Sequence, residues 1–244
     1  MAHRRHHDQE SEVARRLHEG GCVRYTHNFI KARLIERFVP YRAHLLDLGC
    51  GQGGDLLKHR RKRLRSYRGI DISHRAIAST NARICAINLR CRVKLECRDF
   101  CTREWQISKA YDAVSCQFAL QRAFQSEAAA RFVIAQVASS LKDGGFFLGT
   151  IPTHESQPSF VPVVTKLPGE ACECIEYSAT HADIKRICEE CMLDEVLFAD
   201  FQHFFEQERS AAAALVSRMR AFVSPDKDNA VFVYRKHPEI IPMG

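Results

Sequence analysis

The stretch HLLDLGCGQGGD, residues 44–55, decides the fold class of this chain. Its apolar first half predicts a short buried strand, and the glycines that follow predict a tight turn. A helical pattern continues from the turn, so the stretch predicts a strand, a glycine loop and a helix. In open α/β sheets, ligands bind at such junctions, outside the carboxyl ends of the strands. The sequence therefore predicts an α/β fold with a ligand site at this loop.

Strand and helix patterns alternate around the glycine loop, with no internal repeat and no Pro/Gly/Ser-rich linker. The alternation predicts a Rossmann-like, mostly parallel seven-stranded sheet with helices on both faces. The predicted helices are Tyr25–Phe38, Gly53–Arg63, a helix capped by Ser73 that runs to Ile87, Glu127–Leu141 (stopped by Gly144–Gly145), Thr180–Cys191 and Glu206–Phe222. The predicted strands are His44–Leu48, Tyr67–Ile72, Arg92–Cys97, Tyr111–Cys116, Phe146–Ile151, Glu195–Phe201 and Ala230–Tyr234.

Length and composition fit one globular domain. The chain has 244 residues, 45% of them apolar, which is enough for a sizeable core. We expect a single domain over residues 21–236, a mobile basic tail over residues 1–20 and a C-terminal tail over residues 237–244. The 11 cysteines, an odd number, predict reduced thiols in a cytosolic or nuclear protein. We expect no transmembrane helix and no secretory signal, because no apolar run is long enough for either.

The net charge of +7 is concentrated in one segment, Lys58–Arg68. This segment holds seven basic residues and no acidic one, whereas the rest of the chain holds 29 of each sign. Such a run is typical of a site for an anionic partner, phosphate groups above all. It is equally typical of a solvated helix face or a nuclear-import signal. The run alone leaves these interpretations open.

Three aspartates surround the glycine loop in the predicted sheet. Asp71 ends the second predicted strand, where a carboxylate can accept hydrogen bonds from both hydroxyls of a ribose. Asp99 follows the third strand, where it can receive an adenine amino group, and Asp47 lies two residues before the first glycine. These carboxylates suit S-adenosylmethionine, which has no phosphate, better than a dinucleotide, whose pyrophosphate they would repel. The alternative is that Asp71 and Asp99 only cap helices.

Several blocks over roughly residues 21–236 resemble the eukaryotic and viral mRNA cap guanine-N7 methyltransferases. The most specific are Arg24-Tyr-Thr-His-Asn-Phe-Ile-Lys31 and Ser115-Cys-Gln-Phe-Ala-Leu120. The glycine loop with Gln52 where lysine is usual, Gly69–Ser73, Gly144–Pro152 and the Glu176-Tyr177 pair match as well. The resemblance implies a class I methyltransferase fold, the cofactor S-adenosylmethionine and methyl transfer to N7 of the guanine cap (GpppN) of mRNA.

The resemblance also implies roles for positions of this sequence. Lys31 would meet the carboxylate of the methionine moiety, and Glu176 would face the guanine as a positioning and electrostatic group. Two alternatives are that Phe118 belongs to the core and that Glu176 is a surface carboxylate. The cofactor-binding residues would be Lys31, Asp47, Gly49, Gly51, Asp55, Asp71, Asp99 and Gln117. The substrate-binding residues would be Asn28, Lys58, Arg83, Phe118, Gln121, Arg122, Glu176 and Tyr177.

Three positions depart from the family's pattern. Gln121 and Arg122 replace a His-Tyr pair, and Asn229 stands where a cap-facing tyrosine is usual. Gln121 still offers a hydrogen bond to a base edge, and Arg122 offers stacking or a phosphate contact. The segment between Pro152 and Glu176 is also shorter than usual. A related purine therefore stays open as the acceptor.

The predicted reaction needs no general base, because guanine N7 already carries an in-plane lone pair. We expect in-line displacement that is accelerated by positioning, with Glu176 favouring the shift of positive charge to the purine. His27 is the nearest base candidate, but a structural role fits it better.

Two cysteine pairs, Cys172/Cys174 and Cys188/Cys191, have spacings that zinc sites also use. The second pair lies at i,i+3 on a predicted helix, where a buried face explains it more simply. We therefore expect no metal.

Two other functions remain open. One is methyl transfer to another nucleotide or small molecule, and the other is a catalytically inactive subunit of a capping complex. The expected partner is capped RNA, with an RNA triphosphatase and a guanylyltransferase implied by the family, and no membrane. We expect a nuclear location, or a cytoplasmic one for a viral or parasitic protein.

Within the basic run, Lys58 would serve the cap triphosphate, while Arg60–Arg65 would guide the RNA backbone or face solvent.

Overall fold

The computed structural model describes residues 24–102, 104–105, 110–153, 157–166, 173–222 and 228–238. The predicted tail at residues 1–20 lies outside these ranges, as do the last six residues. His237 contacts the turn before the strand that starts at Leu193. Its N–H donates to the Met192 carbonyl at 3.0 Å, and its ring lies 2.8 Å from the Asp194 carboxylate. Contacts of the sheet therefore extend to this residue.

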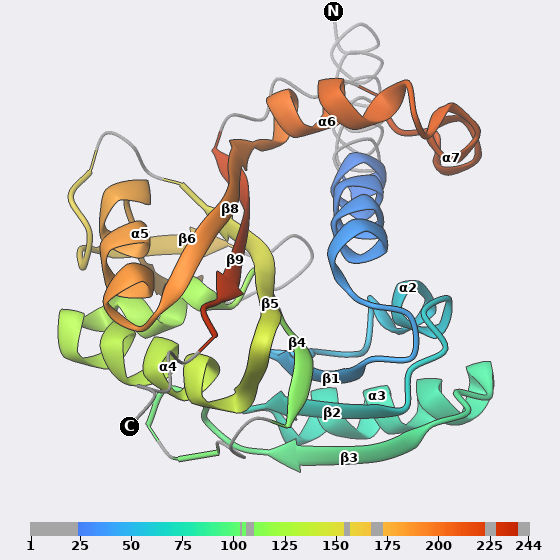
Figure 1. Cartoon of the computed structure of the whole chain (residues 1–244), viewed down its shortest axis with the longest axis horizontal. Coiled ribbons are helices and arrows are strands. Elements are labelled where there is room, and N and C mark those ends of the chain that lie inside the picture. Colours follow the sequence, from blue (N-terminus) through green and yellow to red (C-terminus); the bar gives the residue numbers. More distant parts are fainter. Residues whose placement is uncertain are drawn as a thin grey trace, which may run out of the picture.

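Seven strands form one sheet in the order β3-β2-β1-β4-β5-β9-β8 (Figure 1). Strands β1 to β5 pair in parallel, and β9 lies antiparallel between β5 and β8. This confirms the predicted mostly parallel seven-stranded sheet. The strands are β1 (His44–Leu48), β2 (Ser66–Asp71), β3 (Arg92–Cys97), β4 (Tyr111–Gln117), β5 (Leu141–Pro152), β8 (Leu193–Asp200) and β9 (Asn229–Lys236).

Helices cover both faces of the sheet and enclose two apolar cores. One core takes its helical residues from η1, α4 and α5, and the other from the helix at residues 24–38, α2, α3 and α6. Strands buried on both sides need continuous apolar runs, which is why the central strands were recognisable in the sequence. The helices are residues 24–38, α2 (Leu56–Arg60), α3 (His74–Ile87), η1 (Leu120–Gln125), α4 (Glu127–Ser140), α5 (His181–Glu190), α6 (Phe201–Arg209) and α7 (Ala213–Met219).

Three predicted helix boundaries were wrong. The helix expected at Gly53–Arg63 is only the five-residue α2, because positive φ angles of 73° at Gly53 and 46° at Arg63 lie outside helical backbone. α4 ends at Ser140 and β5 follows at once, so Gly144–Gly145 lies within a strand, beside a register shift against β4. The helix expected at Glu206–Phe222 is the pair α6 and α7, separated at residues 210–212.

One further sheet was missed by the sequence reasoning. β6 (Pro162–Lys166) and β7 (Glu173–Tyr177) form an antiparallel pair, and β7 lies against η1. Each strand is short and pairs only with the other, so neither has the continuous apolar run of a central strand. The hairpin brings Ile175 and Tyr177 towards the carboxyl ends of the parallel strands.

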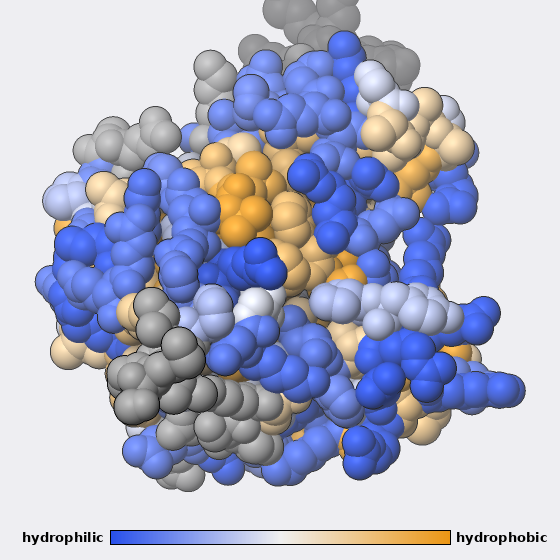
Figure 2. Space-filling view, in the orientation of Figure 1, coloured by the Kyte–Doolittle hydropathy of each residue, from blue (hydrophilic) through white to orange (hydrophobic). Residues whose placement is uncertain are grey.

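Figure 2 shows apolar side chains gathered between the helix at residues 24–38 and β8, with hydrophilic side chains around them. Phe38 of this helix and Phe146 of β5 contact each other, with ring centroids 5.9 Å apart. The guanidinium of Arg37 lies 4.9 Å from the Phe38 ring, and that of Arg235 lies 5.8 Å from the Phe146 ring. The arginines thus cover apolar rings while their charges remain at the surface.

The helix at residues 24–38 is anchored by the last helical segments of the chain. Arg33 Nε donates to the Glu208 carboxylate at 2.9 Å, and Arg37 pairs with the same carboxylate. At the other end of the helix, the Thr26 hydroxyl donates to the Phe222 carbonyl at 2.9 Å. These contacts fix the helix that carries Asn28 and Lys31.

Candidate functional site

The glycine loop turns sharply at the carboxyl end of β1. Gly49, Gly51 and Gly53 have φ angles of 67°, 53° and 73°, in the left-handed region that glycine adopts without strain. The Gly49 N–H donates to the Ile70 carbonyl of β2 at 2.8 Å. A methyl group at position 49 would overlap the side chain of Ala119. Glycine therefore lets the loop lie close to both β2 and the segment after β4.

Asp71 ends β2 and Asp99 follows the neighbouring strand β3, and both line the same space as this loop. The Asp71 carboxylate accepts hydrogen bonds from the N–H groups of Gly51 (2.8 Å) and Ser73 (2.9 Å). The Asp99 carboxylate accepts one from the Cys101 N–H at 2.8 Å. The cap of α3 is the Ser73 hydroxyl and not Asp71. Because a carboxylate has about four acceptor positions, both aspartates keep capacity for hydrogen bonds from a ligand.

These residues open onto a cleft of about 900 Å³ at the carboxyl ends of the parallel strands. This volume is typical of a site for a small molecule. The first wall of the cleft holds Gly49, Gly51, Asp71 and Asp99, and the second holds Phe118, Arg122 and Tyr177. The structure thus brings together predicted residues from both the cofactor group and the substrate group.

Four other predicted residues form a polar cluster between the helix at residues 24–38 and α2. Asp55 is its centre, with Lys31 Nζ at 2.9 Å and Lys58 Nζ at 2.6 Å. Lys58 Nζ also donates to the Asn28 side chain at 2.9 Å. Burial raises the pKa of Asp55, but the two ammonium groups outweigh it and bring the pKa to about 2. Both lysines are therefore already paired with a carboxylate, and none of the four lines the cleft.

Asp47 points into the protein and not into the cleft. Its carboxyl group is 4% exposed and accepts a hydrogen bond from the Tyr67 hydroxyl at 2.8 Å. Burial, followed by the charge of Asp55, raises the pKa of Asp47 to about 7. His59 lies behind this pair, and burial lowers its pKa to about 4. Neither ring nitrogen of His59 has a hydrogen-bond partner among the described residues.

Phe118 links the cleft to an aromatic stack. Its backbone φ is 54°, an uncommon value for a residue with a side chain, and its N–H donates to the Thr150 carbonyl at 2.9 Å. The His27 ring stacks on Phe118 with centroids 5.5 Å apart and meets the edge of Phe201 at 5.0 Å. Gln117, the residue before, bonds within the sheet instead: its amide contacts the Ser115 and Thr150 hydroxyls. Phe118 thus contacts both the core and the cleft.

Gln121 and Glu176 form a buried pair beside the cleft. The Gln121 amide donates to Glu176 Oε1 at 3.1 Å and to the Phe118 carbonyl at 3.0 Å. The exposed fractions of the two residues are only 1% and 8%, so Glu176 is not a surface carboxylate. Gln121 Oε1 has no hydrogen-bond partner among the described residues. A buried carbonyl oxygen of this kind can still accept a hydrogen bond from a ligand or water.

Arg83, a predicted substrate-binding residue, and Asn229, a departure from the family's pattern, do not line the cleft. Arg83 is exposed on α3, and its guanidinium donates to the Gly53 carbonyl at 3.3 Å. Asn229 begins β9 and pairs with Pro152 of β5. The sequence reasoning missed Arg75 and Ile175, which line the cleft. Arg75 follows the predicted cap of α3, and Ile175 alternates with Tyr177 along β7, so both had a positional signal.

Within the described residues, no helix is long and apolar enough to cross a membrane. The same part of the chain holds no group of three or more His, Cys, Asp or Glu residues placed to bind a metal ion. Cys188 is buried in the core on α5 and Cys191 caps that helix, whereas Cys172 lies outside the described residues.

Comparison with sequence families gives a clear match. The family model for the mRNA (guanine-N(7))-methyltransferase domain matches residues 2–166. An mRNA cap guanine-N(7) methyltransferase of Eremothecium gossypii is 37% identical over 154 residues, which are 54% of this chain and 33% of that protein. The Saccharomyces cerevisiae enzyme of the same name is 34% identical over 165 residues, 62% of this chain and 38% of its own length. The chain thus spans little more than a third of these relatives.

Solved structures show the same fold at lower sequence identity. An S-adenosylmethionine-dependent methyltransferase from Methanosarcina mazei superposes with a TM-score of 0.62 at 15% identity, covering 84% of this chain and 97% of that one. The [4+2]-cyclase SpnF also gives a TM-score of 0.62, at 18% identity, covering 86% of this chain and 81% of that one. The two neighbours are named for different reactions, so this likeness establishes the architecture alone.

Proposed function

The chain belongs to the mRNA (guanine-N7)-methyltransferase family, and on this premise we propose that it transfers a methyl group from S-adenosylmethionine to N7 of the guanine cap of RNA. The observation that carries the proposal is the cleft. There the glycine loop, Asp71 and Asp99 line the same space as Phe118, Arg122 and Tyr177. One wall suits an adenosine, and the other suits a base that is joined to phosphates.

The cofactor wall fits S-adenosylmethionine by its chemistry. Asp71 would accept hydrogen bonds from the ribose hydroxyls, and Asp99 would accept one from the adenine amino group. Gly49 and Gly51 leave room for the methionine moiety close to the backbone. A cofactor without phosphate tolerates two carboxylates, whereas a pyrophosphate would be repelled by them. When bound, S-adenosylmethionine supplies an electrophilic methyl group on a positively charged sulfur.

In this structure Lys31 and Asp47 are bonded to other side chains of the protein and do not line the cleft. Lys31 is paired with Asp55, so meeting a ligand carboxylate would require it to exchange or share that partner. Asp47 of β1 accepts a hydrogen bond from Tyr67 of β2 and so ties together the two strands beside the glycine loop. We therefore propose Asp47 as a positioning residue for the glycine loop.

The substrate wall fits a guanine. Glu176 and Gln121 together would present a carboxylate oxygen and an amide carbonyl oxygen, and guanine offers N1–H and an exocyclic amine as donors. Phe118 would pack against the base, held in place by the His27 ring behind it. Arg122 is exposed at the cleft and suits the phosphates that follow the guanine.

No side chain has to remove a proton, because guanine N7 is a nucleophile as it stands. Catalysis would come from holding N7 in line with the methyl group at near-attack distance. Positive charge moves towards the purine during transfer, and the buried carboxylate of Glu176 would favour that movement. His27 is engaged in the aromatic stack, which agrees with a structural role.

Capped RNA is the proposed substrate, and the proposed location is the nucleus, where eukaryotic mRNA is capped. By the same reasoning, an RNA triphosphatase and a guanylyltransferase would act before this protein, since they create the cap that it methylates.

The function is tested with purified chain, labelled S-adenosylmethionine and three acceptors: GpppA, GTP and Gppp-RNA. Transfer to N7 of GpppA and Gppp-RNA supports the proposal. Transfer to GTP alone would indicate another nucleotide substrate, and cofactor binding without transfer would indicate an inactive subunit. Glu176→Ala should lower the transfer rate, whereas Glu189→Ala, an exposed carboxylate on α5, should not. Wild-type rate and cap affinity in Glu176→Ala would refute the role of this residue.

A further inference from the structure

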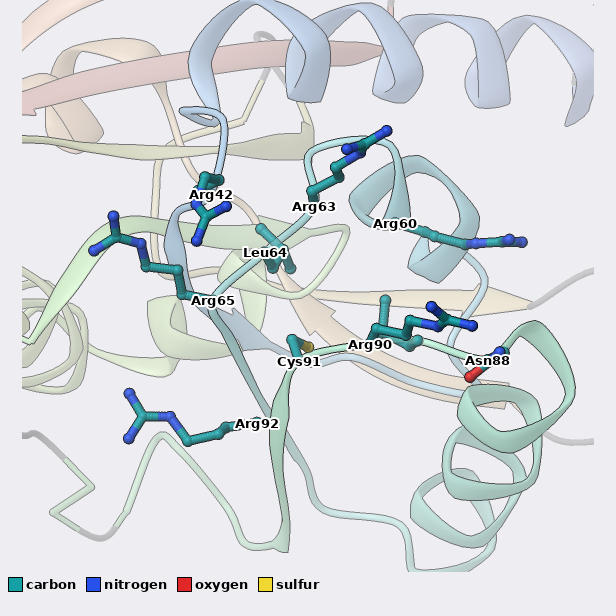
Figure 3. Close-up of a pocket in the computed structure, with 10 residues that line it drawn as sticks. Arg42, Arg60, Arg63, Leu64, Arg65, Asn88, Arg90, Cys91 and Arg92 are labelled. Atoms are coloured by element: carbon teal, nitrogen blue, oxygen red, sulfur yellow. The ribbon is translucent and has the colours of Figure 1, made fainter.

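A second hollow lies at the opposite edge of the sheet from the cleft, at the amino ends of β1, β2 and β3. Its volume is about 840 Å³, and Figure 3 shows the arginines around it, which lie in or directly next to three loops. One loop precedes β1, one joins α2 to β2, and one joins α3 to β3. The arginines are Arg42, Arg60, Arg63, Arg65, Arg90 and Arg92.

Backbone hydrogen bonds hold these loops together. The Arg65 N–H donates to the Ala43 carbonyl at 2.9 Å, and the Arg92 N–H donates to the Arg65 carbonyl at 3.2 Å. The Arg42 N–H donates to the Lys62 carbonyl at 2.8 Å. The three loops are thus one continuous platform, and the arginine side chains extend from a fixed backbone.

The charge of this hollow is uncompensated within the described chain. None of its six arginines forms an ion pair with an acidic side chain that the structure describes, and no acidic residue lines it. Other basic residues behave differently: Arg68, from the same basic run, is buried against Glu96 at 2.7 Å, and Lys58 is paired with Asp55. The six guanidinium groups carry the same charge around one hollow, and an anion bound there would offset that charge.

Two of these arginines also occupy backbone positions that favour glycine. Arg42 has a φ angle of 59° and Arg63 one of 46°. A side chain at such a φ is strained, and strain of this kind is concentrated at functional positions. Here it places long cationic side chains around the hollow.

We propose that this arginine hollow binds the phosphodiester backbone of the RNA downstream of the guanine that enters the cleft. A neighbouring hollow of about 330 Å³, lined by Leu57, Arg60, Arg61 and Arg63, shares two arginines with it. The two hollows form a strip that leads back to α2, the helix that follows the glycine loop. An extended strip suits a polymer of phosphates better than a compact anion.

The path from cleft to hollow is short enough for an RNA chain. β2 has six residues and connects the two edges, so they are separated by roughly 17–20 Å at about 3.3 Å per residue. No aromatic side chain lines the hollow, which leaves no platform for base stacking. Binding there is therefore independent of sequence and driven by charge. The inference rests on the proposed function for the identity of the RNA, and its binding test does not depend on methyl transfer.

The test compares a hollow variant, Arg60→Gln/Arg63→Gln/Arg90→Gln, with a control of equal charge, Lys185→Gln/Arg209→Gln/Arg218→Gln, whose positions are exposed on α5, α6 and α7. Binding of uncapped, labelled 20-nucleotide RNA to the full-length chain is measured across a salt series. The hollow variant should bind about tenfold more weakly at low salt, and its slope of log Kd against log salt should fall by about 2. The control variant should stay within about twofold of the wild type.

Activity provides the second measurement. For the hollow variant, kcat/KM should fall about tenfold on Gppp-RNA and stay unchanged on the GpppA dinucleotide. If no acceptor is methylated, the proposed function fails while the RNA titration still decides this inference. Equal weakening of RNA binding in the hollow variant and in the control variant would overturn the proposal that the hollow binds RNA. Hollow-dependent binding of a polyglutamate peptide in place of RNA, or displacement of RNA by inorganic phosphate at low millimolar concentration, would overturn it too.

Discussion

Replacing Asp47 by asparagine should stabilise the domain at neutral and alkaline pH and leave its stability at acid pH unchanged. Asp47 is buried beneath the glycine loop, and its pKa is raised from the usual 3.8 to about 7. The folded protein therefore holds a proton that the unfolded chain releases more readily. Stability from this proton is fully present below about pH 4 and is lost as the pH rises through about 7.

The magnitude follows from the two pKa values. The difference between 3.8 and about 7 corresponds to about 4 kcal/mol of stability lost at alkaline pH. Asparagine keeps a carbonyl oxygen for the Tyr67 hydroxyl but carries no charge to desolvate. A gain approaching about 4 kcal/mol is large beside a typical unfolding free energy of roughly 5–15 kcal/mol.

Urea unfolding of wild type and Asp47→Asn at about pH 5 and about pH 8 measures the effect, since all other titrating groups cancel in the difference. Asp55→Asn is the matched control with the opposite sign. The pKa of Asp55 is about 2 because Lys31 and Lys58 outweigh its burial. The ionised Asp55 carboxylate contributes about 2 kcal/mol to the unfolding free energy. This contribution is present above about pH 4 and is lost as the pH falls through about 2. Equal stabilisation of Asp47→Asn at both pH values, or none at pH 8, would refute the reasoning.

Two further substitutions test the walls of the cleft. Gly49→Ala should lower the unfolding free energy by about 2–4 kcal/mol, because the new methyl would overlap Ala119 at a positive φ. Urea denaturation should show no such loss for Gly54→Ala, whose new methyl meets no atom within 4 Å. Gln121→Met removes a donor from the buried Glu176 carboxylate and should cost about 1–3 kcal/mol. The same substitution should raise KM for GpppA. An unchanged KM would show that the Gln121–Glu176 pair takes no part in guanine binding.

The sheet was predictable because its information is local. Buried parallel strands are short apolar runs, and the helix caps Ser73 and Thr180 are marked by their own hydroxyls. The break between α6 and α7 was not predictable, since no glycine or proline marks residues 210–212. Ala212, at the break, and Ala221, after α7, both pack into the core. The β6–β7 pair likewise depends on a partner strand and not on its own pattern.

The site was predictable as far as strand order defines it. Asp71 and Asp99 follow neighbouring strands, so sequence position alone places them at one edge of the sheet. The hydrogen-bond partners of the site residues depend on the tertiary structure, and the sequence did not predict them. No spacing rule shows that Asp47 turns to Tyr67, or that Lys31 is paired across the loop with Asp55. The same holds for the arginine hollow, whose six arginines lie in or directly next to three loops.

The anchoring of the first described helix has a consequence for how the protein is made. Arg33 is held by Glu208, which lies 175 residues later in the chain. At about 5–20 residues per second, the ribosome needs roughly 9–35 s to synthesise that interval. During this time the strands around the glycine loop have emerged, but the partners that hold the two ends of the helix, Glu208 and Phe222, have not been synthesised. Both ends of the first described helix are therefore fixed last, when the final helical segments reach the helix that was synthesised first.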